Sequence, residues 1–177
     1  MTSPHYFDVE YGINPFMFDA QGNLNKVDRV LAQAQWEKLY RTFQNLGLTV
    51  DTLPGQEGFP DMVFCANQSF PFLHPKTGRP TVMMSHMRSD FRQGEVEYFK
   101  NWYLNQGYEV FHLEESETRF EGNGDLIPFA GTGIFWGGFG PRTEKKVYTE
   151  LSRRFGLEIE PLELIHPNFY HLDTCFM

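Results

Sequence analysis

The stretch EVEYFKNWYLNQGYEV, residues 95–110, holds a helical pattern, a glycine and a short apolar run in that order. Apolar side chains recur three and four positions apart over Glu95–Gln106, which is typical of a helix with one buried face. Gly107 follows at once, and glycine favours the left-handed backbone that ends many helices. The same order of features predicts two further helices, Val27–Leu46 and Glu144–Phe155, which run into Gly47 and Gly156 and then into a short apolar strand.

An ionisable residue follows each of these glycines at nearly the same distance and begins another predicted strand. Asp61, Glu121 and His171 are these residues, and the strands are expected at 61–67, 121–127 and 171–176. Second apolar runs at 82–84 and 134–136 precede the next helices. The repeated order of strand, strand, helix and strand predicts an α/β fold of stacked units in a single partial domain, 1–177. The units are expected at about 1–53 (with a strand at 8–17), 60–113 and 120–163, and a fourth starts at 169–177. An ordinary α+β domain is the alternative.

Composition excludes several classes of partner. The 177 residues carry 15 Lys and Arg against 23 Asp and Glu, a net charge of −8, which disfavours nucleic acid and anionic lipid surfaces. No apolar stretch is long enough to span a membrane, and the N-terminus does not resemble a signal peptide. The two cysteines make no disulfide framework. We therefore expect a cytoplasmic protein.

The ionisable residues that begin equivalent strands are expected to converge on one pocket. Strand alternation would put His171 and Asp173 on one face, and Asp61 and Asn67 on another. Carboxylates, an amide and an imidazole suit a flat cation such as a guanidinium, whose donors pair with carboxylate oxygens in fixed geometry. Each group also has a plainer reading, since Glu121–Asp125 contains an Asn-Gly turn signal and a lone histidine is often structural.

A metal site is a further alternative for His171, Asp173, Glu121 and Asp125, because imidazole and carboxylates suit zinc or manganese. No two histidines stand at a close ligand spacing without an intervening proline. We therefore predict no metal and no other cofactor.

Six segments along the chain resemble the amidinotransferase superfamily, the pentein proteins. They are Asp8–Met17, Pro60–Asn67, Met87–Glu95, Phe120–Asp125, Gly140–Thr143 and His171–Phe176. The likeness is greatest to the dimethylarginine dimethylaminohydrolase-like and arginine dihydrolase branch. It implies an α/β propeller of five ββαβ units, of which this chain would hold about three, and hydrolysis of a guanidino group on arginine or an arginine derivative.

The resemblance also implies roles for individual residues. His171 would be the general acid/base, and Glu121 would hold the guanidinium and help to move protons. Asp61, Asn67 and Asp173 would contact the guanidinium. Asn14, Arg88 and Arg142 would line the site, and the two arginines would grip an α-carboxylate.

The family reaction needs a cysteine thiolate that forms a covalent intermediate with the guanidinium carbon. The resemblance places that cysteine in a fifth unit, so we expect the nucleophile to be absent from this chain and the chain alone to be inactive. Cys175 is expected to serve packing, and no cation near Cys65 in sequence would lower the pKa of its thiol. The alternative is a non-catalytic, truncated relative that binds a guanidino ligand or a complementary C-terminal segment; a homo-oligomer is also possible.

Overall fold

The computed structural model describes residues 1–176 and divides the chain into two compact units. The first unit is Met1–Cys65 and the second begins at Ala66. Each unit is described by itself below. The last residue of the fourth unit predicted to start at 169–177, Met177, lies outside the described residues, and the single-domain organisation stays a prediction.

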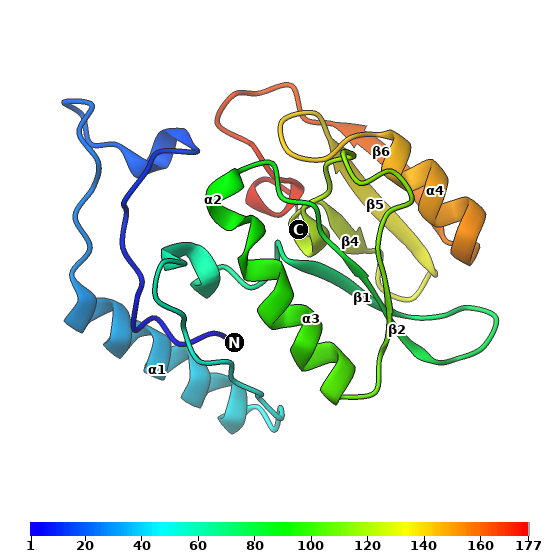
Figure 1. The fold of residues 1–177 in the computed structure, drawn as a ribbon, viewed down its shortest axis with the longest axis horizontal. Coiled ribbons are helices and arrows are strands. Elements are labelled where there is room, and N and C mark those ends of the chain that lie inside the picture. Colours follow the sequence, from blue (N-terminus) through cyan, green and yellow to red (C-terminus); the bar gives the residue numbers. More distant parts are fainter. Residues whose placement is uncertain (177) are drawn as a thin grey trace. The chain divides into compact units, whose positions relative to one another are not determined.

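The N-terminal unit contains one long helix, α1 (Arg29–Asn45), within the range that the sequence predicts (Figure 1). The Asp28 carboxylate accepts a hydrogen bond from the Leu31 N–H and caps the first turn. The helix ends before Gly47, which has a φ of +80°. None of the α1 side chains is buried, and Val30 is 82% exposed. The expectation that this helix buries its apolar face is therefore wrong.

The strands predicted in the N-terminal unit are replaced by turns. Within 8–17 the structure has a 3₁₀ turn, η1 (Pro15–Met17), and a second one, η2 (Pro60–Val63), overlaps the start of 61–67. Each turn has proline at its start, where the fixed proline φ favours a helical turn. Residues 47–50 form no strand either. β-pairing in this unit consists of two isolated bridges, Thr2 with Leu53 and Phe18 with Leu24.

The C-terminal unit contains two three-stranded sheets, each built from strand, strand, helix and strand (Figure 1). The first sheet is β1 (Ser69–Leu73), β2 (Pro80–Met84) and β3 (Glu109–Phe111), with α2 (Asp90–Gln93) and α3 (Glu95–Asn105) before β3. The second is β4 (Leu126–Pro128), β5 (Ile134–Phe139) and β6 (Glu158–Glu163), with α4 (Lys146–Phe155) before β6. In both sheets the first pair of strands is antiparallel and the second pair is parallel.

The sequence predictions for this unit are confirmed at the helices and at the strands that precede and follow them. Runs 82–84 and 134–136 lie within β2 and β5, and the runs after Gly107 and Gly156 become β3 and β6. These glycines have φ values of +80° and +74°, as the helix ends require. The mixed α/β class is confirmed, whereas the five-unit propeller stays a prediction.

The core of the C-terminal unit joins α4 to both sheets. Val147, Leu151 and Phe155 lie on the buried face of α4, four residues apart. They pack in one cluster with Phe70 and Met83 of the first sheet and with residues 120, 126, 148 and 157. Phe120 and Leu126 of this core flank the turn that carries part of the polar cluster described below.

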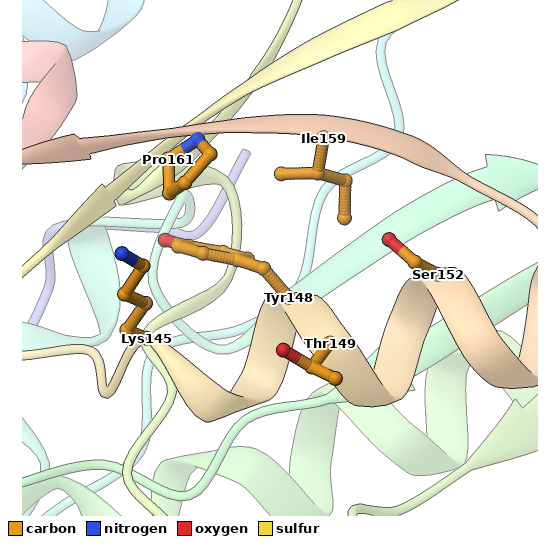
Figure 2. A pocket seen from close by; sticks show the side chains of 6 residues that line it. All are labelled: Lys145, Tyr148, Thr149, Ser152, Ile159 and Pro161. Atoms are coloured by element: carbon orange, nitrogen blue, oxygen red, sulfur yellow. The ribbon is translucent and has the colours of Figure 1, made fainter.

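A pocket with a volume of about 280 Å³ lies between α4 and β6. Tyr148, Thr149 and Ser152 line it from the helix, and Ile159 and Pro161 line it from the strand (Figure 2). The Tyr148 hydroxyl lies 3.2 Å from the Asp125 carbonyl oxygen and also donates to the Gly138 carbonyl. Tyr148 therefore supports the backbone that carries Asp125.

Among residues 1–176, no helix combines the length and the apolar character that crossing a bilayer would require.

Candidate active site

Two 3₁₀ turns of the C-terminal unit bring Glu121, Asp125 and His171 together. Glu121 and Asp125 flank η3 (Gly122–Gly124), and His171 precedes η4 (Leu172–Thr174). The strands predicted to begin at Glu121 and His171 are therefore wrong, although β4 begins at Leu126. The convergence predicted for Glu121 and His171 occurs through turns instead.

The glycines of the motif Glu121-Gly-Asn-Gly-Asp125 are required by the close packing of η3. Gly122 has a φ of +53°, and a Cβ there would lie 2.3 Å from the Ser69 carbonyl oxygen. A Cβ at Gly124 would lie 2.5 Å from the Asn67 amide nitrogen and 3.2 Å from His171 Nδ1. Real Cβ atoms essentially never show contacts as short as 2.3 or 2.5 Å, and 3.2 Å is tighter than most. The two glycines therefore let the turn approach β1 and the His171 ring.

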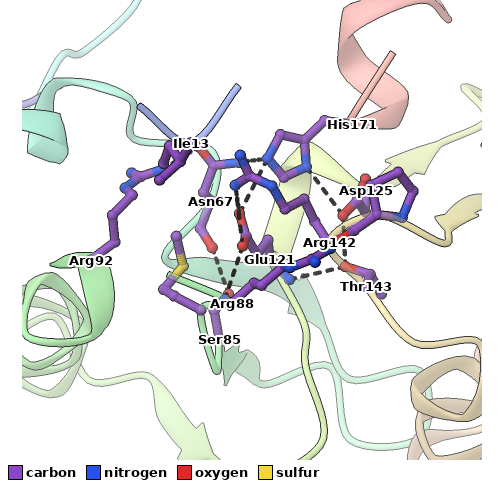
Figure 3. Close-up of polar contacts among 12 residues, drawn as sticks. Ile13, Asn67, Ser85, Arg88, Arg92, Glu121, Asp125, Arg142, Thr143 and His171 are labelled. Carbon is purple, nitrogen blue, oxygen red and sulfur yellow. Dashed lines mark hydrogen bonds and ion pairs between the residues drawn. The ribbon is translucent and has the colours of Figure 1, made fainter. Parts of the chain in front are cut away.

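The His171 imidazole lies between two carboxylates, one at each ring nitrogen. Nε2 is 3.2 Å from Glu121 Oε2, and Nδ1 is 3.2 Å from Asp125 Oδ2 (Figure 3). All three side chains are at most 5% exposed. A buried imidazole with an acid at both nitrogens is held in one orientation and is stabilised in its protonated form.

Thr143 links the two carboxylate positions. Its hydroxyl donates to Asp125 Oδ2 at 2.6 Å and accepts from the Glu121 N–H at 3.1 Å. The other Asp125 oxygen accepts from the Leu172 N–H at 3.1 Å, which ties η4 to the start of β4. Asp125 thus fixes both the ring and the backbone of the His171 segment.

Glu121 already holds a guanidinium, that of Arg142. Arg142 Nη1 lies 3.1 Å from Glu121 Oε2 in a pair whose side chains are 6% and 0% exposed. The same guanidinium lies 5.1 Å from the centre of the Tyr170 ring. The Arg88 N–H donates to Glu121 Oε1 at 3.0 Å, while the Arg88 side chain donates to the Pro141 carbonyl oxygen.

A series of buried polar side chains reaches the same ring nitrogen of His171 that Glu121 contacts. Asn67 Nδ2 lies 3.2 Å from His171 Nε2, and Asn67 Oδ1 accepts from Arg92 Nη1 at 3.2 Å. Arg92 also pairs with Glu95 at 2.9 Å, and Glu95 accepts from the Gln68 amide at 2.6 Å. Figure 3 shows Asn67 between Arg92 and the imidazole.

These contacts shift the pKa values of Glu121 and His171 in opposite directions. Burial alone would raise the pKa of Glu121, but the His171 imidazole, the Arg142 charge and the Arg88 N–H outweigh it and lower the pKa to about 2. Burial would likewise lower the pKa of His171, but Asp125 and Glu121 raise it to about 9. At neutral pH the cluster therefore holds an ionised Glu121 beside an imidazolium.

The raised pKa of His171 predicts a loss of stability in alkali. A group whose pKa is higher in the folded chain stabilises the fold fully below its ordinary pKa, 6.5 here, and that contribution disappears as the pH rises through about 9. The free energy of unfolding of the native chain should therefore fall from pH 6.5 to 9.5 relative to that of His171→Gln. Urea unfolding of both proteins across this range measures the difference. A difference that stays constant with pH would contradict the assigned protonation.

Three further predicted site residues, Asp173, Asp61 and Asn14, lie at 3₁₀ turns. Asp173 is exposed, and because it lies within η4 it does not share a strand face with His171. Asp61 is buried at the start of η2, and Asn14 caps η1 through the Phe16 N–H. Both belong to the N-terminal unit. The roles of all eight predicted site residues stay predictions.

The sulfur atoms of both cysteines contact backbone or hydroxyl groups. The Cys65 sulfur contacts the Thr2 N–H and hydroxyl at 3.1 and 3.2 Å. Cys175 is exposed, so its expected packing role is wrong, and its sulfur contacts the backbone carbonyls of His171 and Leu172. No cationic side chain contacts either sulfur among these described contacts.

The proposed metal set does not form a coordination site. Glu121 and Asp125 lie at opposite nitrogens of the His171 ring, so one ion cannot bind both of them and a ring nitrogen together. Within residues 1–176, no group of three or more His, Cys, Asp or Glu side chains is arranged to hold a metal ion.

Asp125 and the pair Arg92–Glu95 are the parts of the cluster that sequence reasoning missed. Asp125 carried no assigned role beyond the metal alternative, and Arg92 lies in a polar stretch that resembles a solvated surface. The spacing of Arg92 and Glu95, three residues apart at a helix start, was the available signal of an ion pair.

Comparison with known proteins identifies the family. The sequence model of the family "N,N dimethylarginine dimethylhydrolase, eukaryotic" matches residues 3–177. The chain belongs to this family. The family's placement in the pentein superfamily, near the arginine dihydrolases, agrees with the resemblance of the six sequence segments.

Individual relatives of the dimethylarginine hydrolase family support this placement. The chain is 37% identical over 176 residues to the bifunctional arginine dihydrolase/ornithine cyclodeaminase AgrE of Nostoc sp., covering 99% of this chain and 24% of AgrE. It is 36% identical over 175 residues to N(G),N(G)-dimethylarginine dimethylaminohydrolase of Mycobacterium tuberculosis, covering 99% of this chain and 53% of the relative. This chain thus spans about a quarter to a half of the lengths of these two relatives.

The structural comparison finds the same fold. The N-terminal domain of ArgZ, an arginine dihydrolase from cyanobacteria, matches with a TM-score of 0.89 and 36% identity, over 99% of this chain and 61% of that domain. That structure is a cysteine-to-serine mutant bound to substrate. Another ArgZ structure, with an asparagine-to-serine change, is covalently bonded to a reaction intermediate and matches at 35% identity with the same TM-score and the same coverage of both chains.

Proposed function

We propose that this chain carries the substrate-binding and proton-transfer groups of a hydrolase that acts on the guanidino group of arginine or an arginine derivative. The observation that supports it most is the ionised, buried Glu121, which is paired with a guanidinium and lies beside the His171 imidazolium. A carboxylate in this state is suited to bind a substrate guanidinium. An adjacent imidazolium is suited to protonate a leaving amine.

The contacts of Glu121 define what a substrate would have to displace. Its two oxygens offer about four acceptor positions. Arg142 contacts both oxygens, and the Arg88 N–H and His171 contact one each. A substrate guanidinium would therefore replace Arg142 on Glu121. Arg142, once released, would be available to bind the α-carboxylate of arginine, the role that the family resemblance gives it.

The proposed reaction uses His171 twice. A cysteine thiolate attacks the guanidinium carbon, the C–N bond breaks, and the leaving amine takes a proton from the imidazolium. Water then attacks the same carbon and gives one proton to the neutral imidazole. The C–S bond breaks, which releases the ureido product and restores the thiolate, and the second proton of the water passes to the departed amine or to solvent. We infer that the thiolate comes from a segment outside Met1–Met177, because within residues 1–176 the Cys65 and Cys175 sulfurs contact backbone and hydroxyl groups rather than a cation. Asp61, Asn67 and Asp173 would add contacts to the guanidinium, and Asn14 would line the site.

Calorimetric titration of the chain with L-arginine tests the binding part of this proposal. L-arginine and asymmetric dimethylarginine should bind, whereas L-citrulline, which has the same carbon chain with a neutral urea group, should bind at least ~10-fold more weakly. Glu97→Gln, at an exposed carboxylate on α3, is the matched control and should leave the affinity for arginine unchanged. Equal binding of citrulline and arginine would exclude a guanidinium site.

An assay for ammonia, citrulline and ornithine tests the assignment of the nucleophile. The chain alone should release none of these from L-arginine. Turnover that survives both Cys65→Ser and Cys175→Ser would contradict a cysteine mechanism. If arginine binds but no added polypeptide ever restores turnover, the chain is instead a non-catalytic guanidino-binding relative.

A further inference from the structure

The acid/base residue of the proposed function has one ring nitrogen that faces both a donor and an acceptor. His171 Nε2 lies 3.2 Å from Glu121 Oε2 and also 3.2 Å from Asn67 Nδ2. Glu121 can accept a hydrogen bond from Nε2 when Nε2 carries a proton. The Asn67 N–H can donate a hydrogen bond to Nε2 only when Nε2 has lost that proton. Protonation of His171 is therefore opposed by Asn67.

The orientation of the Asn67 amide is decided by Arg92. A guanidinium only donates hydrogen bonds, so the Asn67 atom that faces Arg92 Nη1 at 3.2 Å must be the oxygen. The amide nitrogen then has to face His171. The backbone of Asn67 is fixed as well, because the Ser85 hydroxyl donates to its carbonyl oxygen at 2.6 Å.

Arg92 itself is held rigidly. Its Nε and Nη2 atoms both bond the Glu95 carboxylate, at 2.9 Å for Nη2 and Glu95 Oε2, and the side chains are 4% and 0% exposed. Gln68 donates to the same carboxylate at 2.6 Å. Because two edges of the guanidinium bond Glu95 and Asn67, Arg92 cannot release the amide without breaking a buried ion pair.

We propose that Arg92 is a positioning residue that makes His171 a stronger acid by locking the Asn67 amide with its nitrogen toward Nε2. With Asn67 held in this orientation, the neutral imidazole is stabilised and release of the Nε2 proton is easier. Asn67 therefore opposes Glu121 and Asp125, which stabilise the imidazolium. The charged and titratable groups that face or adjoin His171 are Glu121, Asp125, Asp173 and Tyr170. Arg142 acts on His171 indirectly, because it is paired with Glu121.

The test is the pKa of His171 measured by NMR, with the signal assigned among the six histidines by its absence in His171→Gln. Arg92→Lys keeps a buried positive charge for Glu95 but removes the planar fork that reaches Asn67. The amide can then turn its oxygen toward the imidazolium, and the pKa of His171 should rise by about one unit. Arg154→Lys, in the Glu150 pair on α4, is the matched control and should leave it unchanged.

A second variant shows whether the effect passes through Asn67. Asn67→Ala removes the donor and should raise the pKa of His171 by itself, whether or not Arg92→Lys folds. In the Asn67→Ala background, Arg92→Lys should cause no further shift. An unchanged or lowered pKa in Asn67→Ala, or an equal Arg92→Lys shift in both backgrounds, would overturn the proposal.

This inference rests on the proposed role of His171, but its test uses no substrate. Failure of arginine to bind would therefore reject the proposed function while leaving the measured coupling intact. If arginine binds but the pKa of His171 is unchanged in Arg92→Lys and Asn67→Ala, only the role of Arg92 is rejected.

Discussion

Glu121→Gln should lower the free energy of unfolding by about 3–5 kcal/mol, the usual cost of breaking a buried ion pair from one side. The variant leaves Arg142, only 6% exposed, and the imidazolium of His171 without their shared negative charge. The neutral amide can still accept hydrogen bonds but cannot offset two cations. Urea unfolding followed by circular dichroism at pH 7 measures the change.

The exposed pair of Glu97 and Lys100 provides the control for this prediction. Its side chains are 61% and 29% exposed, and Glu97→Gln should cost less than ~1 kcal/mol. Equal losses in the two variants would show that Glu121 is not a buried counter-charge. Under conditions where Glu121→Gln remains folded, its affinity for L-arginine should fall at least ~10-fold.

Gly122→Ala should disrupt both the fold and the cluster. Its φ of +53° would cost an alanine about 1–2 kcal/mol, and the new Cβ would lie 2.3 Å from the Ser69 carbonyl oxygen. Relieving that contact requires η3 to move, at a further cost of about 1–3 kcal/mol. Because Glu121 and Asp125 flank this turn, the movement should also shift the NMR signal of the His171 ring.

Gly131→Ala separates the two causes. Gly131 has a φ of +81°, and a Cβ there would meet nothing within 4 Å. This variant should show the backbone cost alone and leave the His171 signal in place. If Gly122→Ala destabilises the chain no more than Gly131→Ala and also leaves the His171 signal in place, then η3 does not depend on the close packing described here.

The helices and their ends could be predicted because their signals are local. Helix α3 begins at Glu95 and α4 ends at Phe155, as the apolar spacing indicates. Gly107 and Gly156, which follow these helices, have the expected positive φ. The apolar spacing also predicted the helix α1 correctly, but none of the side chains of α1 is buried. Periodicity therefore predicts the helix, whereas burial depends on which surfaces it packs against.

The strands at the ionisable residues were predicted wrongly because short alternating runs also fit a tight turn. At Glu121–Asp125 the glycines allow a 3₁₀ turn, which side-chain bonds of Asp125 and Thr143 then stabilise. At His171 the Thr174 hydroxyl bonds the His171 carbonyl oxygen and closes η4. Side-chain bonds of this kind compete with strand pairing and leave no periodic signal in the sequence.

The candidate site was predictable only in part. Glu121 and His171 were expected to meet, and they do. The linked contacts of Asn67, Arg92 and Glu95 were not foreseen, because they join the segment just before β1 to the helices that follow β2. Such contacts are set by the packing of distant elements.

A crystal structure of the chain with L-arginine tests the central claim most directly. The guanidinium of the ligand should lie within hydrogen-bond distance of the Glu121 carboxylate and next to His171, and Arg142 should have left Glu121. Arginine bound away from this cluster, with the contact between Arg142 and Glu121 intact, would contradict the account.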